Sequence, residues 1–451
     1  MENGARYRVE RDALGEKKIA CNVMYGINTV RALENFDLNG EKVNYHLIRG
    51  IVMVKKAAAL TYEELHPEKA EVYHAISEVC DEILYKEKRE YFPLQALQGG
   101  AGTSTNMNVN EVLANLALIK LGHNPGEYEY VHPIDDVNRG QSTNDVYPTG
   151  FRIAAIERLR ILSEECAKLQ KILQEKENEY EDIKKLGRTE LMDAVPVTMG
   201  QEFGAYAQGI ARDRWRLYKV EERLRQINLG GTAVGGSDTT ERKYRFRVVE
   251  KLRNLTGLGL AAAEYPMDIT QNMDVYVEVS GLLKALAVNL LKISNDLRLM
   301  NSGPYGGLGE IRLAAMQQGS SIMPGKINPV IPEMVMQTSM RVCANDTAIT
   351  MAAGRGEFEL NAFGPLMAES ILESLELMSD TVRIFREKAV KTLKVETKNC
   401  NKYLENSFAF ATAYVPLLGY DRVSEILKRY EIKEAKKILE QEKHEYEETV
   451  N

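Results

Sequence analysis

The longest uninterrupted helical pattern in the chain does most to limit what it can fold into. Residues 151–186 contain neither glycine nor proline, and apolar side chains recur there at spacings of three and four. These side chains are Ile156, Leu159, Leu162, Cys166, Leu169 and Leu173. The pattern predicts one long amphipathic helix, which must bury its apolar stripe against other helices.

Four further stretches carry a similar pattern. We predict helices over residues 199–228, 267–300, 330–353 and 366–396. No stretch of useful length alternates apolar and polar residues as a half-buried strand does. The segment before residue 140 has shorter helices broken by Gly, Pro and Asn, and the segment after 396 is rich in Lys and Glu. The sequence therefore predicts an all-α protein whose centre is a bundle of long helices, with helical domains over residues 1–140, 141–395 and 396–451.

The predicted helix over residues 267–300 is apolar on more than one face. Its segment VYVEVSGLLKALAVNLLKI leaves little polar surface for solvent. One interpretation is that this helix contacts another subunit. The other is that it forms the centre of a monomeric bundle.

The balance of charged residues limits which kinds of molecule the protein can bind. Lys and Arg number 58 against 65 Asp and Glu, which gives a net charge of −7 without any basic stripe. This balance argues against nucleic acid as the main partner. If the ligand is an anion, its site must be locally positive within an acidic protein.

Targeting signals and ligand spacings point to a cytoplasmic protein without a metal. The first dozen residues hold six charged side chains, and no window reaches the length of apolar sequence that spans a membrane. The five cysteines are scattered without a CxxC pair, which is typical of a reducing cytoplasm. The six histidines show no ligand spacing, so we expect no zinc site.

Clusters of hydroxyls and amides interrupt the helical patterns. Three of them, each before a predicted helix, are GGAGTSTNMN (99–108), GQSTNDVYPTG (140–150) and LGRTELMDAVP (186–196). For any one cluster, helix capping is the simpler explanation. A fourth stretch, GSSIMPGKINP (319–329), has the period of neither helix nor strand, yet carries two serines, a lysine and an asparagine. Together the four favour a site for carboxylate or phosphate at converging helix N-termini.

The chemistry that fits such a site is proton abstraction next to a carboxylate. Donors aimed at the oxygens of the resulting enediolate supply most of the rate. A loop serine flanked by backbone N–H groups and a lysine has its pKa lowered toward that of a usable base. The GGAGTS stretch is not a nucleotide loop, because no strand precedes it and the P-loop Gly-Lys-Ser/Thr is missing.

At these residues the chain resembles a known family. GSSIMPGKINP is similar to the signature of the aspartase/fumarase superfamily, and further similar blocks occur in the family's order over about residues 8–400. They include HPIDDVNRGQSTNDVYPTGFRIA, GRTELMDAVPVTMGQEF and SGPYGGLGEI. GGAGTSTNMN resembles the aspartate ammonia-lyase branch. The resemblance implies reversible deamination of L-aspartate to fumarate and ammonia, with no organic cofactor.

The resemblance also implies roles for single residues. Ser320 would be the general base that takes the β-proton. Lys326 and Asn328 would hold the α-carboxylate with help from Thr189, and Glu333 matches a family glutamate behind the site.

The other end of the substrate involves a second group. The residues implied around the β-carboxylate are Thr103, Ser142, Thr143 and Ser321, and Asn144 would contact the amino group. Family members are homotetramers with a core of long helices, and three chains contribute to each active site.

Four departures from the family pattern bear on the substrate. Glu190 stands where many members have His and some aspartases have Gln. A glutamate there must be protonated, turned away or paired with a cation, and the two candidate cations are Arg188 and the substrate ammonium. We hypothesise that Glu190 contacts the leaving ammonium or selects a modified aspartate; a tolerated polar exchange has equal weight. The other departures are Ile134 with Asp136, Tyr305 and Gly236.

Three alternatives stay open. Fumarase is disfavoured by GGAGTST and by the absence of His at position 190. A lyase for another amino dicarboxylate or an N-substituted aspartate is favoured by Glu190 and Tyr305. An inactive helical scaffold is disfavoured because it has no need of Ser320, Lys326 and Asn328 on an irregular loop.

Overall fold

The computed structural model describes residues 6–236 and 240–450. The chain divides into two compact units, each built from separate stretches of sequence. The first comprises Met1–Ser163, Trp215–Ala287 and Met340–Ser379, and the second Glu164–Arg214, Val288–Ser339 and Asp380–Asn451. Within the described residues, helices dominate, so the predicted all-α class is confirmed.

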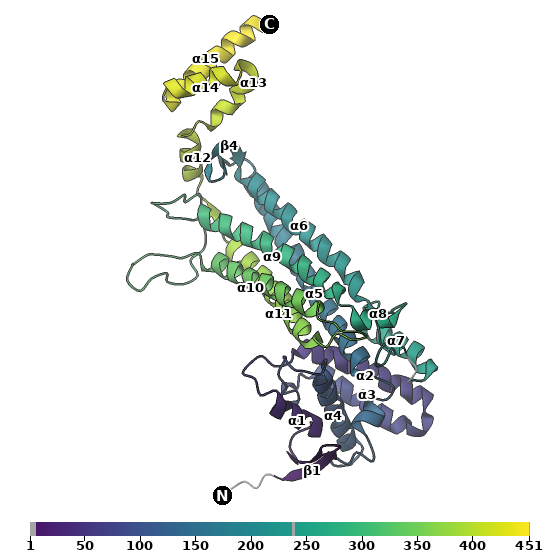
Figure 1. The fold of residues 1–451 in the computed structure, drawn as a ribbon. Helices are drawn as coiled ribbons and strands as arrows, with labels where there is room; N and C mark the ends of the chain where they lie inside the picture. Colours follow the sequence, from purple (N-terminus) through teal and green to yellow (C-terminus); the bar gives the residue numbers. More distant parts are fainter. Residues whose placement is uncertain (1–5, 237–239, 451) are drawn as a thin grey trace. The chain divides into compact units, whose positions relative to one another are not determined.

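The first unit contains the N-terminal helices. Helix α2 (Tyr45–Leu65) packs against α3 (Ala70–Tyr85) and α7 (Arg242–Thr256), and α4 (Thr103–Lys120) packs against α1 (Ile27–Asn35) and α3 (Figure 1). Helix α2 is buried over most of its length because its sequence consists largely of apolar residues and has few polar ones. It therefore serves as a core helix.

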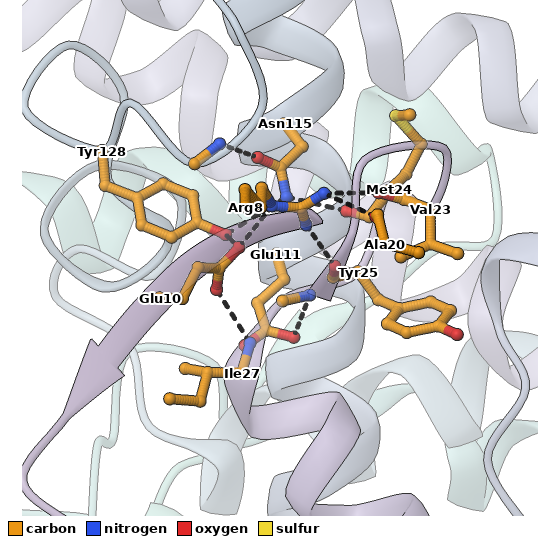
Figure 2. A network of polar contacts seen from close by, with 12 residues as sticks. Arg8, Glu10, Ala20, Val23, Met24, Tyr25, Ile27, Glu111, Asn115 and Tyr128 are labelled. Carbon is orange, nitrogen blue, oxygen red and sulfur yellow. Dashed lines mark hydrogen bonds and ion pairs between the residues drawn. The ribbon is translucent and has the colours of Figure 1, made fainter. Parts of the chain in front are cut away.

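A network of buried charges ties the N-terminal hairpin to this core. The hairpin consists of β1 (Tyr7–Asp12) and β2 (Gly15–Ala20). Arg8 donates to Glu10 at 2.8 Å and to three backbone carbonyls, while Glu10 and Glu111 accept from the free N–H groups that begin α1 (Figure 2). Carboxylates at a helix N-terminus complement its partial positive charge. The two glutamates therefore hold α1 in place.

Five long helices supply segments to both units. They are α5 (Thr143–Glu179), α6 (Met199–Leu224), α9 (Asp274–Met300), α10 (Val330–Ala353) and α11 (Gly364–Phe385). In the first unit Phe151 of α5 stacks on Tyr276 of α9, with ring centroids 4.4 Å apart. In the second unit Tyr206 of α6 donates to Asp296 of α9 at 2.8 Å. The predicted bundle of long helices is thus confirmed.

The bounds of α10 agree with the prediction, but α5 begins eight residues earlier than expected. It starts at Thr143 and contains Pro148, which lacks the N–H that would bond the carbonyl of Asn144. The side chain of Asn228 replaces that donor, since its Nδ2 donates to the Asn144 carbonyl at 2.9 Å. This substitute bond explains how a helix can continue through a proline.

Other predicted helices end earlier or are divided. Helix α6 stops at Leu224, and α11 stops at Phe385 before a π-helical turn over Arg386–Val390. The expected helix over 267–300 is two helices, α8 (Pro266–Gln271) and α9. The break lies at Asn272 and Met273.

Four two-stranded sheets lie among the helices of the described residues. Residues 184–186, predicted as the end of a helix, belong to β3 (Lys184–Thr189), which pairs with β4 (Met192–Thr198) in an antiparallel hairpin. Short strands also pair as β5 (Gln226–Ile227) with β6 (Ala261–Ala262), and as β7 (Ile311–Arg312) with β8 (Lys394–Val395). The sequences of β3 and β4, KKLGRT and MDAVPVT, do not alternate regularly between apolar and polar residues, so they carry no strand signal.

The C-terminal segment has an apolar cluster of its own. Its helices are α12 (Thr397–Glu405), α13 (Val415–Leu418), α14 (Tyr420–Arg429) and α15 (Ile432–Val450). The buried cluster comprises Val423 and Ile426 of α14, Ala435 and Leu439 of α15, and Ala411 of the 3-10 helix Ala409–Tyr414. The division into three domains stays a prediction. In the part of the chain that the structure describes, no helix combines the length and apolarity needed to cross a membrane.

Candidate active site

The predicted site residues fall into two groups, one in each unit. The first unit holds Thr103, Ser142, Thr143 and Asn144. The second unit holds Thr189, Glu190, Ser320, Ser321, Lys326, Asn328 and Glu333. Each group has a local geometry that can be compared with its predicted role.

The GSSIMPGKINP stretch is an irregular loop, as predicted. Residues 313–329 lie between β7 and α10 without helix or strand, and such long loops in compact proteins are usually functional. Backbone N–H of Gly319 donates to the carbonyl of Lys326 at 3.0 Å, and Nδ2 of Asn328 donates to the carbonyl of Gly319 at 2.9 Å. These two bonds close the base of the loop.

Ser320 is half-buried inside this loop. Its Oγ accepts hydrogen bonds from the backbone N–H groups of Ile322, at 3.2 Å, and Met323, at 3.1 Å. Donors aimed at an oxygen stabilise its anionic form. The geometry therefore contains the backbone donors expected around a serine base.

Lys326 and Asn328 line a cavity of about 800 Å³. The charged residues that line it are Arg298, Arg312, Lys326, Lys394, Glu333 and Glu396. Four cations face two carboxylates, so the lining is positive although the whole chain has a net charge of −7. An anion is the ligand that this charge favours.

Glu333 lies in the first turn of α10 at the wall of the same cavity. Its carboxylate is 3.8 Å from the guanidinium of Arg298, near the end of α9. Long ion pairs of this kind between half-exposed groups contribute little stability. Both side chains are therefore available for other contacts.

Thr189 and Glu190 lie at the tip of the β3–β4 hairpin. Glu190 and Leu191 form its two-residue turn with φ of +54° and +65°. Both values lie in the left-handed region, where such turns usually carry Asn-Gly. Neither Thr189 nor Glu190 is buried.

Arg188 does not neutralise Glu190. Its Nη1 donates to Glu310 at 2.9 Å, and its guanidinium lies 5.4 Å from the ring centre of Tyr403. Among the described residues, no cation forms an ion pair with Glu190. Glu190 is exposed, and its contact with the substrate ammonium stays a prediction.

In the first unit, the residues before α5 make local hydrogen bonds. Oγ of Ser142 accepts from the N–H of Asn144 at 3.2 Å, and Oγ1 of Thr143 accepts from Nδ2 of Asn106 at 3.2 Å. Nδ2 of Asn144 donates to the carbonyl of Ala233 at 2.8 Å. At α4, Oγ1 of Thr103 donates to the carbonyl of Gly100 at 2.7 Å. These contacts fix the side chains at the two helix N-termini.

Two buried charges behind this group were missed from the sequence. Asp145 accepts from the N–H groups of Ser142, Gly230 and Thr232, and burial raises its pKa to about 6. Lys55 donates to Asn138 and Gln141, and burial lowers its pKa to about 7. The only signal for Asp145 was its place directly after Ser-Thr-Asn. Lys55 lies in an apolar helix and gave no signal.

Comparisons with known proteins place the chain in a family. It matches the family model described as Lyase over residues 15–344. It is 45% identical over 419 residues to an aspartate ammonia-lyase of Corynebacterium glutamicum, covering 92% of this chain and 80% of that protein. This chain belongs to the aspartase/fumarase superfamily.

Further members of the superfamily show similar sequences and folds. The chain is 42% identical over 427 residues to an aspartate ammonia-lyase of Bacillus subtilis, covering 94% of this chain and 90% of that protein. A fumarate lyase:delta crystallin from Brucella melitensis superposes with a TM-score of 0.91 at 43% identity, covering 94% and 93% of the two chains. A class II fumarase from Schistosoma mansoni has a TM-score of 0.93 at 30% identity, covering 99% and 98%.

The other residues that depart from the superfamily pattern differ from one another in burial and contacts. Asp136 is buried, pairs with Lys69 at 2.6 Å and accepts from the N–H of His132, so it has a structural role. Ile134 and Tyr305 are exposed. Gly236 directly precedes residues 237–239, which lie outside the described part of the chain.

Proposed function

We propose that this chain is an aspartate ammonia-lyase that converts L-aspartate reversibly to fumarate and ammonia. The observation that carries the proposal is the loop of residues 319–329. It combines a serine that receives two N–H donors with a lysine on a positively lined cavity. The aspartate ammonia-lyases that it matches at 42–45% identity over more than nine-tenths of its length support the choice of substrate.

In the proposed reaction, Ser320 takes the β-proton of L-aspartate. The electron pair left on carbon delocalises into the β-carboxylate as an enediolate, and the C–N bond then breaks to release ammonia. Two N–H donors on Oγ lower the cost of holding the serine as an alkoxide. Deprotonating a carbon acid needs such help, because an ordinary hydroxyl is too weak a base.

The α-carboxylate would bind to Lys326 and Asn328, assisted by Thr189. Asn328 uses one Nδ2 proton on the carbonyl of Gly319, and the second amide proton is left for a carboxylate oxygen. One side chain would therefore close the loop and hold the substrate at the same time.

The β-carboxylate would bind to hydroxyl donors at the helix N-termini and to Ser321. Ser142 and Thr143 accept hydrogen bonds through their oxygens, which leaves their O–H protons to donate to an anion. Asn144 spends its Nδ2 on Ala233, so its amide oxygen can accept from the substrate ammonium. Thr103, which donates to Gly100, would have to turn its hydroxyl toward the substrate.

The proposal includes a cytoplasmic homotetramer with active sites composed from several chains. Exposed apolar side chains on the long helices support the assembly: Trp215, Tyr218, Val288, Met340 and Met351. All five cysteines are free thiols, as expected in a reducing compartment.

The first test is the appearance of fumarate, followed by ultraviolet absorbance, when the protein is mixed separately with L-aspartate and L-malate. Rapid release from L-aspartate alone supports the proposal. Release from L-malate alone would make the chain a fumarase. No release from either, in a folded tetramer, would contradict both activities.

A second candidate function is a lyase for a modified aspartate. The observation that favours it is Glu190, a carboxylate without a cation partner among the described residues, on a hairpin tip next to Thr189. A substrate with an added positive group would supply that partner. Comparing turnover of L-aspartate with that of N-substituted aspartates separates the two functions.

A further inference from the structure

Two cations face each other across the short sheet that precedes the Ser320 loop. Arg312 of β7 is the direct cross-strand partner of Lys394 of β8. Like charges in this position repel and destabilise a sheet. Arg312 has a carboxylate partner, Glu396 at 3.1 Å, whereas no ion pair among the described residues involves Lys394. The pair therefore carries an uncompensated positive charge.

Both cations line the cavity of about 800 Å³ described above. Arg298 lines it too, and its guanidinium has only the long ion pair with Glu333, at 3.8 Å, as a charged partner among the described residues. A four-carbon dicarboxylate held by Lys326 would fill only a small part of this volume.

We propose that Arg298, Arg312 and Lys394 form a second anion site in this cavity, distinct from the carboxylate contact of Lys326. The fitting ligand is a small dianion, either inorganic phosphate or a dicarboxylate. It would offset the repulsion across β7 and β8 and accept charge-assisted hydrogen bonds.

The site is connected directly to the Ser320 loop. The loop begins at Leu313, immediately after Arg312, and the N–H of Leu313 donates to Oδ1 of Asn301 at 2.8 Å. Asn301 also lines the cavity. An anion that holds β7 against β8 therefore restricts the first residues of the loop, and we expect it to reduce the loop's opening.

The test is calorimetric titration of the full-length protein with inorganic phosphate at constant ionic strength. We expect saturable binding of one phosphate per chain, weakened roughly tenfold or more in Lys394→Gln. Lys402→Gln removes an exposed cation on α12 outside the cavity and is the matched control, with binding unchanged. Lys326→Ala should retain the site. Phosphate should also slow trypsin cleavage after Lys326 in wild type and not in Lys394→Gln.

Two results would overturn the inference. One is the absence of saturable phosphate binding. The other is binding that Lys326→Ala abolishes and Lys394→Gln leaves intact, since the anion would then occupy only the proposed substrate position. Titrating the Lys326→Ala variant with succinate as well as phosphate separates the two ligand classes, because tighter binding of succinate indicates a dicarboxylate. None of these measurements needs turnover, so they stand apart from the outcome of the lyase assay.

Discussion

At the scale of single residues, Ser320 is where the predicted chemistry and the local geometry meet most directly. Its residue type and loop were read from the sequence, and the two backbone donors on its Oγ are a property of the folded loop. Spacing alone does not reveal such donors, because they depend on how residues 320–323 turn. The assignment of Ser320 as the base stays a prediction.

Replacing Ser320 by Ala tests that assignment. We expect turnover of L-aspartate to fall by about 10² to 10⁴-fold, the usual contribution of a positioned base. Circular dichroism and sedimentation should be unchanged, because the side chain is half-buried and forms no core contact. Ile322→Ala on the same loop, at a side chain that is 83% exposed, is the control for disturbance of the loop. Retained activity in Ser320→Ala would move the base elsewhere.

Glu190→Gln tests whether the carboxylate at the hairpin tip meets the substrate. Since Arg188 is engaged with Glu310, we expect the exchange to alter KM for L-aspartate several-fold or to change the range of amino acids accepted. Steady-state kinetics with L-aspartate and its N-substituted forms provide the measurement. Unchanged constants and unchanged range would leave Glu190 as a tolerated polar exchange.

At the scale of elements, sequence periodicity predicted the long helices but missed the start of α5 and the β3–β4 hairpin. Helix α10 has a clear 3.6-residue pattern and was predicted at its observed bounds. The start of α5 was missed because Pro148 normally ends a helix, and the compensating donor, Asn228, lies 84 residues away. The polar cluster LGRTELMDAVP was expected to precede a helix directly but forms the β3–β4 hairpin, whose turn residues Glu190 and Leu191 lack the usual Asn-Gly signal.

The closure of the Ser320 loop gives a prediction at this scale. A Cβ on Gly319 would lie 2.3 Å from the carbonyl oxygen of Lys326, so Gly319→Ala must break the bond that closes the loop. We expect kcat/KM to fall at least tenfold while the helical signal stays the same. Gly306→Ala is the matched control, because nothing lies within 4 Å of its added methyl group. Equal activity of the two variants would show that loop closure is not needed.

Helix α11 gives a second prediction, concerning pH. Three glutamates of this helix, Glu369, Glu373 and Glu376, lie on one face. Glu41 is close enough to Glu369 to affect its pKa. Burial, with repulsion from Glu373, Glu41 and Glu376, raises the pKa of Glu369 to about 7 from an ordinary 4.5, although Arg341 opposes the shift. His46 pairs with Glu376 at 3.2 Å and Arg341 with Glu373 at 3.1 Å, so Glu369 carries the excess charge.

The sign of the effect follows from proton binding. Between about pH 4.5 and 7 the folded chain holds a proton on Glu369 that the unfolded chain has lost, so stability falls as pH rises through this window. Because the carboxyl group of Glu369 is partly exposed, we expect the free energy of unfolding to fall by only about 1 kcal/mol across this pH window. Thermal unfolding at pH 5 and 8 should show a smaller difference in Glu369→Gln than in wild type or in Glu71→Gln, an exposed control. An unchanged difference would contradict the shift.

At the scale of the whole molecule, exposed apolar side chains indicate how the chain assembles. Trp215, the single tryptophan, is 62% exposed on α6, and Met351 is 68% exposed on α10. Such side chains away from any core cost free energy in water unless another surface covers them. Sequence reasoning found this signal only as excess apolarity in residues 267–300, because it requires knowing which faces the fold leaves uncovered.

Trp215 therefore reports on assembly. We expect its fluorescence emission to lie at short wavelength in the assembled protein and to shift to longer wavelength on dilution, as the indole returns to water. Sedimentation at the same concentrations should show a tetramer dissociating. A long-wavelength emission that does not change with concentration, or a monomer throughout, would contradict the proposed assembly.

The pairing of β7 with β8 has a consequence for how the protein is made. The strand that anchors the start of the Ser320 loop lies about 80 residues further along, and the N–H of Glu396 also bonds the carbonyl of Glu310 at 2.8 Å. On the ribosome, Ser320, Lys326 and Asn328 emerge well before that anchor does. A nascent chain that stops before residue 394 would thus carry every residue of the proposed chemistry but lack the β7–β8 pairing, and only late in translation does the start of the loop gain that support.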